Sequence, residues 1–166
     1  MDELDLAILA CLQSNGRMSN AEMGRRVGLV PSAVYQRVRK LEEQGVIRGY
    51  RVELDPVALD QGLLAFVTVR TSEGARAPET SAALAGIPEV LEVHRVVGED
   101  CFFLKVRVAD TAALGRLLDE TIQPLKQVAS TRTTIVLCTA KDAPGARVHV
   151  PAPAPSLDNE TLSESA

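Results

Sequence analysis

A short segment near the N-terminus carries the side chains best suited to contacting DNA. Val34, Val38 and Leu41 recur at helical spacing, so the other side chains of this segment point outward. Arg and Gln carry donors that match guanine and adenine edges in the major groove, and Ser, Tyr and Lys can hold phosphates. The candidate DNA-binding residues are Ser32, Ala33, Tyr35, Gln36, Arg37, Arg39 and Lys40. An ordinary solvated basic face is the alternative, and Arg37 can instead pack against the first helix.

Local charge supports the DNA-binding interpretation, although the charge of the whole chain does not. The 166 residues include 18 basic and 22 acidic side chains, for a formal net charge of −4. Residues 17–48, however, hold seven basic and three acidic side chains, a local charge of +4. A basic patch of this kind is what a nucleic-acid-binding surface requires.

Three short helices are predicted to position this basic surface. The second has a Ser19–Glu22 capping pattern, and Pro31 suits the first turn of the third because its missing N–H has no partner there. The second and third are joined by a tight Gly-Leu turn, which is a helix-turn-helix pattern. The predicted helices span residues 2–15, 19–28 and 31–45.

A turn in the second half carries carboxylates that can receive the ammonium of a small ligand. Gly98 permits a tight turn, and Glu99 and Asp100 can accept charge-assisted hydrogen bonds there. An ordinary hydrophilic hairpin turn is the alternative, and the sequence alone favours it. Cys101 is either a reactive thiol or, more commonly at a strand start, a core residue. The candidate effector-binding residues are Gly98, Glu99, Asp100, Cys101, Phe102, Thr131 and Thr133, the threonines only if their hydroxyls line a pocket.

The elements that carry this turn are predicted to follow the order βαββαβ. Strands are expected at 63–70, 90–97, 101–108 and 131–138, with helices at 79–86 and after Asp110. This order is the ferredoxin-like arrangement, an antiparallel sheet with both helices on one face, so the whole chain is of the α+β class. Strand 63–70 is apolar on both faces, and its second face is most simply covered by another subunit.

The predicted organisation has four segments. Residues 1–50 form the helix-turn-helix domain, 51–62 a linker strand or hinge, 63–142 the αβ domain, and 143–166 a tail. Apolar and charged residues alternate over 46–55, which predicts either a strand leaving the head or a connector. The tail is rich in Pro, Ala and Ser, so we expect it to be disordered or extended over its neighbours. Removal of residues 145–166 is expected to leave folding, dimerisation and DNA binding intact.

Several functional classes are excluded. No run approaches 18 apolar residues, which excludes a membrane span, and three acids among the first five residues do not suit a signal peptide. The three widely spaced cysteines favour a reduced, cytoplasmic protein. Two histidines and no CxxC pair do not make a usual zinc site. Nucleotide-binding and hydrolase signatures are missing, so we expect neither an enzyme nor a metal or other cofactor.

The motifs together resemble those of the Lrp/AsnC (feast/famine) family of transcription regulators. The resemblance implies an N-terminal winged-helix-like DNA head and a C-terminal ligand-sensing αβ sandwich. It also implies dimers that assemble further, often to octamers, with a small effector, usually an amino acid, between dimers. The matching stretches lie within residues 2–142 and are LDLAIL, NGRMSNAEMGRRVGLVPSAVYQRVRKLEEQGVIRGYRVELDP, VLEVHRVVGEDCFFLKVRV and STRTTIVLCTAKD.

Two positions depart from the family pattern. Val30 stands where many members have a serine before the helix-opening proline, and it cannot cap; we expect Pro31 and burial of Val30 to offset the loss. Cys101 stands where many members carry aspartate, with Asp100 beside it. The sequence therefore predicts a regulator that binds double-stranded DNA as a dimer and responds to an amino acid or related metabolite. The alternatives are an architectural protein that bends or wraps DNA without an effector, and an enzyme or binding module, for which we find no catalytic pair.

Overall fold

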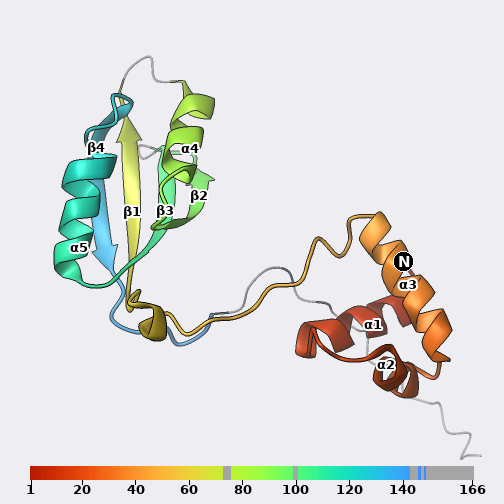
Figure 1. Cartoon of the computed structure of the whole chain (residues 1–166). Helices are drawn as coiled ribbons and strands as arrows, with labels where there is room; N and C mark the ends of the chain where they lie inside the picture. The colour runs from red at the N-terminus through yellow and green to blue at the C-terminus, as the bar shows by residue number, and fades with distance from the viewer. Residues whose placement is uncertain (73–75, 99–100, 143–145, 147, 149–166) are drawn as a thin grey trace, which may run out of the picture. The chain divides into compact units, whose positions relative to one another are not determined.

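The computed structural model describes residues 1–72, 76–98, 101–142, 146 and 148 (Figure 1). They form two compact units, and each is considered by itself. The first, here called the head, is Met1–Val52 with the described residues of the C-terminal segment. The second, here called the sheet domain, is Glu53–Asp142. No helix in the described part of the chain is long and apolar enough to cross a membrane.

The head contains the three predicted helices, α1 (Glu3–Ser14), α2 (Asn20–Val27) and α3 (Pro31–Glu43). Each contributes one stripe to a small shared core, as its apolar spacing indicates. The buried residues of this core are Ile8, Met18, Met23 and Val34. The helix-turn-helix prediction is therefore confirmed.

Local residue types explain where the first two helices begin. The Asp2 carboxylate accepts a hydrogen bond from the Asp5 backbone N–H at 2.9 Å, and the Asp5 carboxylate accepts one from the Asp2 N–H at 3.0 Å. This reciprocal capping box satisfies two donors that a helix start leaves free. At α2 the Ser19 hydroxyl oxygen caps the Glu22 N–H at 3.2 Å, while the Glu22 carboxylate pairs with Arg26 at 2.9 Å.

The start of α3 differs from what the sequence suggested. Val30 makes no side-chain cap, as expected, but 63% of its surface is exposed. The expectation that burial of Val30 offsets the missing cap is therefore wrong. Pro31 still favours the start of α3, because proline has no backbone N–H that would need a hydrogen-bond acceptor in the first turn.

The turn between α2 and α3 is held by the backbone of Gly24. Gly28 ends α2 in the left-handed conformation at φ 72°, and the Gly24 carbonyl accepts the N–H groups of both Gly28 and Leu29, the latter at 2.9 Å. Gly24 is itself buried, and a Cβ built on it lies 2.4 Å from the Leu29 carbonyl oxygen. This approach of two backbone segments requires glycine at position 24.

The sheet domain has the predicted βαββαβ order. Its antiparallel strands lie in the order β2-β3-β1-β4, which is the ferredoxin-like topology. A π-helix, η2, continues α5, so the single predicted helix after Asp110 has two parts. The elements are β1 (Leu63–Thr71), α4 (Ala77–Ala85), β2 (Val90–Arg95), β3 (Phe102–Val108), α5 (Thr111–Arg116), η2 (Leu117–Ile122) and β4 (Val128–Ile135).

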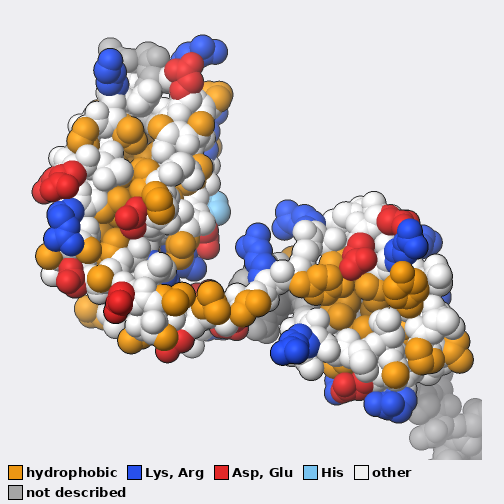
Figure 2. Space-filling view, in the orientation of Figure 1, with side chains coloured by type: hydrophobic (Ala, Val, Ile, Leu, Met, Phe, Trp, Pro, Cys, Tyr) orange, Lys and Arg blue, Asp and Glu red, His pale blue; other side chains and the backbone are white. Residues whose placement is uncertain are grey.

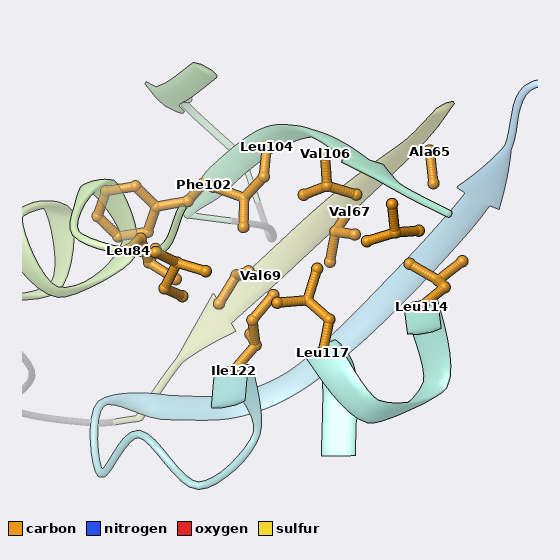
Figure 3. Packing of buried hydrophobic residues seen from close by; sticks show 12 residues of the cluster. Ala65, Val67, Val69, Leu84, Phe102, Leu104, Val106, Leu114, Leu117 and Ile122 are labelled. Atoms are coloured by element: carbon orange, nitrogen blue, oxygen red, sulfur yellow. The ribbon is translucent and has the colours of Figure 1, made fainter. Parts of the chain in front are cut away.

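One face of the sheet carries both helices. Alternate residues of β1, Ala65, Val67 and Val69, are fully buried and face the helices (Figure 3). Leu84 of α4 and Ile122 of η2 pack on them from the same side. Both helices therefore cover a single face, as the period-2 pattern of the strands predicted.

The opposite face of the sheet, here called the open face, has no helix of the described chain on it. The rings of Phe66 on β1 and Phe103 on β3 stack there, with centroids 5.2 Å apart. Lys105 lies beside them on β3 and pairs with Glu92 of β2 at 3.4 Å. Leu64, on the same side of β1, is only 7% exposed. The open face thus has an apolar centre with charged groups next to it.

The linker is a connector without regular secondary structure, and two described residues of the C-terminal segment contact the head. Residues 48–55 form neither helix nor strand, because no described strand pairs with them, and a short 3-10 turn, Val57–Leu59, follows. The Tyr50 hydroxyl donates to Glu42 at 2.9 Å, which fastens the start of the linker to α3. Ala146 and Val148 hydrogen-bond to the side chain of Gln13, so this part of the C-terminal segment lies against the head.

Candidate DNA-binding and effector sites

The outward face of α3 presents most of the predicted DNA-binding side chains. Ala33 and Arg37 are half-buried, and the other candidates are exposed. Figure 2 shows Lys and Arg side chains at several points around the head, with hydrophobic side chains between them. The exposed candidates are Ser32, Tyr35, Gln36, Arg39 and Lys40.

Arg37 is held by two carboxylates at the start of α1, that of the N-cap residue Asp2 and that of Asp5. Its Nη1 lies 2.7 Å from Asp2 Oδ2 and 2.7 Å from Asp5 Oδ1. The Arg37 guanidinium is the largest cause that lowers the pKa of Asp2. Burial raises the pKa of Asp5, but the Asp2 N–H and Arg37 outweigh it, so the pKa of Asp5 is also lowered. Arg37 therefore ties α3 to the start of α1, the structural role that its sequence position left open.

Arg39 and Lys40 remain available to a phosphate. Arg39 pairs with Glu43 at 2.9 Å, but both side chains are more than half exposed, and such surface pairs contribute about 0–1 kcal/mol. Within the described residues, no carboxylate oxygen lies within 4.0 Å of the Lys40 ammonium. These two side chains, with Gln36 one helical turn earlier, form the polar strip along α3.

Two of the predicted effector-binding residues, Phe102 and Thr131, flank the C-terminal end of β1. Val69 pairs with Phe102 of β3 on one side and with Thr131 of β4 on the other. Two inter-strand spacings, roughly 10 Å, therefore separate the backbones of Phe102 and Thr131. Thr133 pairs with Val67, so both threonines point to the helix-bearing face and are half-buried at the sheet edge.

Cys101 is positioned by a residue that the sequence analysis did not select. The Thr71 hydroxyl donates to Cys101 Sγ at 3.1 Å, and the Cys101 N–H donates to the Val69 carbonyl at 2.9 Å. The Thr71 hydroxyl and backbone lower the pKa of the Cys101 thiol, with smaller contributions from Arg70 and Arg95. The pairing of 71 with 101 depends on the strand register, which the sequence does not display.

The remaining candidates are Gly98, Glu99, Asp100 and Phe102. Gly98 has φ 142°, the positive value that its proposed turn requires. Glu99 and Asp100 lie outside the described residues. Phe102 is only 1% exposed and belongs to the core of the sheet domain. It supports the turn from within the fold.

Comparison with known proteins decides the family. Residues 1–42 match the AsnC-type helix-turn-helix domain, and residues 64–146 match the Lrp/AsnC ligand binding domain. The chain belongs to the Lrp/AsnC family of transcriptional regulators. A relative named leucine-responsive regulatory protein, from Salmonella typhimurium, is 43% identical over 141 residues, which cover 82% of this chain and 85% of the relative.

Solved structures of transcriptional regulators are similar to this chain over most of its length. A transcriptional regulator from Neisseria meningitidis in complex with L-methionine superposes with a TM-score of 0.84 at 31% identity, covering 89% of this chain and 96% of that one. AsnC from Escherichia coli gives a TM-score of 0.79 at 30% identity, covering 91% and 99%. The predicted α+β class, with a helix-turn-helix followed by a ferredoxin-like sheet, is therefore confirmed.

Proposed function

We propose that this Lrp/AsnC protein is a cytoplasmic, sequence-specific regulator that places α3 in the major groove. The observation that carries this is the polar strip of α3 (Gln36, Arg39 and Lys40), exposed on a helix whose turn is fixed by Gly24. Gln36 offers the paired donor and acceptor that match adenine, and Lys40 offers a charge for phosphate. Ser32 and Tyr35 add hydroxyl groups at the N-terminal end of the same face.

The open face of the sheet domain serves as the dimer surface in this proposal. Phe66 and Phe103 form its apolar centre, and half-buried aromatic side chains on a sheet face that no helix of the described chain covers are typical of an interface. A symmetric dimer supplies two recognition helices for two half-sites of a pseudo-palindromic operator. Further assembly, to octamers as in the family resemblance, follows from additional contacts between such dimers.

The effector of the proposed regulator is a free amino acid that binds at the C-terminal end of β1. The turn at Gly98 brings backbone close to the ligand, and the acids that follow can receive an ammonium. A relative is named for leucine and a structural neighbour contains L-methionine, so an aliphatic amino acid is the first candidate. Asp100 is the residue that we assign to the ammonium, because a buried cation without an acceptor is costly.

A thermal-shift screen with the twenty amino acids tests the effector. A ligand at 100 times its dissociation constant stabilises the folded protein by about 2.7 kcal/mol. Asp100→Asn should abolish the shift and leave effector-free DNA affinity within about threefold, since the head is unchanged. Glu99→Gln is the matched control. A shift that survives in Asp100→Asn and disappears in Glu99→Gln would assign the role to Glu99. If no amino acid shifts the melting temperature, the architectural function without an effector replaces this one.

DNA binding itself is tested by its dependence on salt. About six to ten phosphate contacts from a dimer lower the affinity for promoter DNA by ~10³–10⁵ between 50 and 200 mM salt. This steepness is expected although the whole chain carries a net charge of −4, because the contacts come from the basic head. A flat dependence would show that α3 does not dock on DNA in this way.

A further inference from the structure

One side chain makes the last attachment of the linker to the head. Just after α3, the backbone N–H groups of Val46 and Ile47 donate to the Leu41 carbonyl, at 2.9 and 3.1 Å. The next attachment is the Tyr50 hydroxyl, which donates to Glu42 Oε1 of α3 at 2.9 Å. This hydrogen bond is here called the Tyr50 clamp. Among the described residues, no later part of the linker is bonded to α3.

The Tyr50 ring adds a second contact to the clamp. A Cβ built on Gly16, in the turn between α1 and α2, lies 3.9 Å from Tyr50 Cδ1. The ring therefore lies beside this turn while its hydroxyl reaches Glu42. Burial and the bond to Glu42 both raise the pKa of the Tyr50 hydroxyl, so it remains a hydrogen-bond donor at neutral pH.

The sheet domain holds the other end of the linker. The Asp55 carboxylate accepts from the Val57 N–H at 2.9 Å, and the Pro56 carbonyl accepts from the Gln61 N–H at 2.8 Å. Arg107 of β3 donates to the Gln61 carbonyl at 3.4 Å. The 3-10 turn at the end of the linker is therefore tied to the sheet.

The stretch between these two attachments consists of residues 51–54. They are exposed, and within the described part of the chain they make no hydrogen bond or ion pair. Val52 and Leu54 are 81% and 62% exposed, so no core holds the stretch either. Its four residues span at most about 14 Å. Without the clamp the unattached stretch becomes 48–54, and its seven residues span at most about 25 Å.

We propose that the Tyr50 clamp determines which spacing of two DNA half-sites a dimer can bind. The inference rests on the proposed binding of a symmetric dimer to two half-sites. Once one head is bound, the other is held near its half-site at an effective concentration that depends on linker length. A short linker raises this concentration at one spacing and prevents simultaneous binding at spacings that it cannot span. Tyr50 is thus a positioning residue, which selects a distance without contacting a base.

Loss of the clamp has two opposite effects. At the preferred spacing, the effective concentration falls roughly as the −3/2 power of linker length, so binding weakens about twofold. At other spacings, the additional reach of about 11 Å per head corresponds to about three base pairs, which stack every ~3.4 Å. Binding therefore improves where the clamped protein reaches poorly. A protein that is merely less stable loses affinity at every spacing instead.

The test uses the full chain and a half-site that the wild-type protein selects from a random pool of duplexes. Two half-sites are placed at the selected spacing and at two or four base pairs more or less, and another duplex carries one half-site. Tyr50→Phe keeps the ring and removes the hydroxyl, and Glu42→Ala removes its acceptor. Glu53→Ala is the matched control, because Glu53 is an exposed glutamate of the unattached stretch. Insertion of Gly-Ser-Gly after Val52 lengthens the linker and keeps the clamp.

Trypsin reports the clamp without DNA. Arg48 is exposed and lies on the head side of Tyr50, whereas Arg51 lies beyond it. Tyr50→Phe and Glu42→Ala should accelerate cleavage after Arg48 about threefold to tenfold, the range expected for one hydrogen bond, with a smaller change after Arg51. Glu53→Ala should leave cleavage after Arg48 unchanged. Unchanged cleavage after Arg48 in both clamp variants overturns the clamp.

Affinities are compared with that for the single half-site, which removes the general effect of a lost acid. On this scale Tyr50→Phe and Glu42→Ala should bind about twofold more weakly at the selected spacing and at least about threefold more tightly at altered spacings. The insertion should reproduce this pattern, and Glu53→Ala should match the wild type. An equal loss at every spacing, or no change at any, overturns the role in spacing. If the pool yields no half-site, or two half-sites bind no more tightly than one, the proposed dimer on DNA fails and the role in spacing with it, while trypsin still decides the clamp.

Discussion

Replacing Gly24 by alanine should destabilise the head and weaken DNA binding. The added Cβ would lie 2.4 Å from the Leu29 carbonyl oxygen, whereas real contacts of this kind are essentially never shorter than 3.0 Å. The turn therefore has to move by roughly 0.6 Å or more. The atom in the way belongs to the backbone, so no side chain can rotate to relieve the contact. The same movement disturbs the hydrogen bond from Leu29 N–H to Gly24, now 2.9 Å.

The magnitude follows from two opposing contributions. Overpacking at a buried site costs about 1–3 kcal/mol. Alanine recovers about 0.8–1.0 kcal/mol relative to glycine within a helix. We expect a net loss of about 1 kcal/mol and at most about 2, which for a small domain lowers the melting temperature by ~4–8 °C per kcal/mol. Such a loss leaves nearly all molecules folded at 25 °C, so any larger fall in DNA affinity reports the altered angle between α2 and α3.

Tyrosine fluorescence isolates the head in this experiment. The chain has two tyrosines and no tryptophan, and both tyrosines, Tyr35 and Tyr50, belong to the head. Gly115→Ala is the matched control, because nothing lies within 4 Å of its Cβ position in α5, and it should leave the tyrosine transition unchanged. A Gly24→Ala head that melts at or above the wild-type temperature would refute the argument that the backbone approach at Gly24 is tight.

Three further predictions concern charge and assembly. Asp5 has a lowered pKa, so its pair with Arg37 stabilises the head above the ordinary Asp pKa of about 3.9, and this contribution is lost as pH falls through the lowered value. Arg37→Gln should therefore flatten the acid side of the tyrosine-monitored stability curve. Lys40→Ala should weaken binding to all sequences about equally and reduce the salt slope by about one, while Gln36→Ala should cost ~1–3 kcal/mol on the specific site alone. Phe103→Lys should convert assemblies to monomers in light scattering, because it places a charge at the centre of the open face.

Local signals made much of the fold predictable. The starts and ends of the head helices depend on nearby residues, such as Asp2, Ser19 and Gly28, whose effects act within one turn. The βαββαβ order could be predicted from the sequence because apolar residues recur at different spacings in strands and in helices. The bounds of β4 were less accurate, Val128–Ile135 instead of 131–138, because an edge strand ends where its pairing with β1 ends. That register is a long-range property.

Contacts between residues far apart in the chain could not be predicted from the sequence. Thr71 meets Cys101 only through the register of β1, and Gln13 meets Ala146 across almost the whole chain. The caps that were predicted correctly, such as Asp2 and Ser19, depend instead on residues within one turn of the same helix.

The charged residues of the head also depend on contacts that the sequence does not show. These contacts narrow the set of side chains that we expect to bind DNA. The +4 of residues 17–48 counts Arg37 and Arg39 alike, since both look outward on a helical wheel. In the fold, Arg39 shares an exposed pair with Glu43, which a phosphate can replace at little cost. The Arg37 side chain is only 30% exposed and holds two carboxylates at 2.7 Å. If Arg37 moved away to bind a phosphate, the Asp5 carboxylate, which is only 13% exposed, would lose its cationic partner. In the proposed complex a phosphate therefore contacts Arg39 and Lys40, while Arg37 ties α3 to the start of α1.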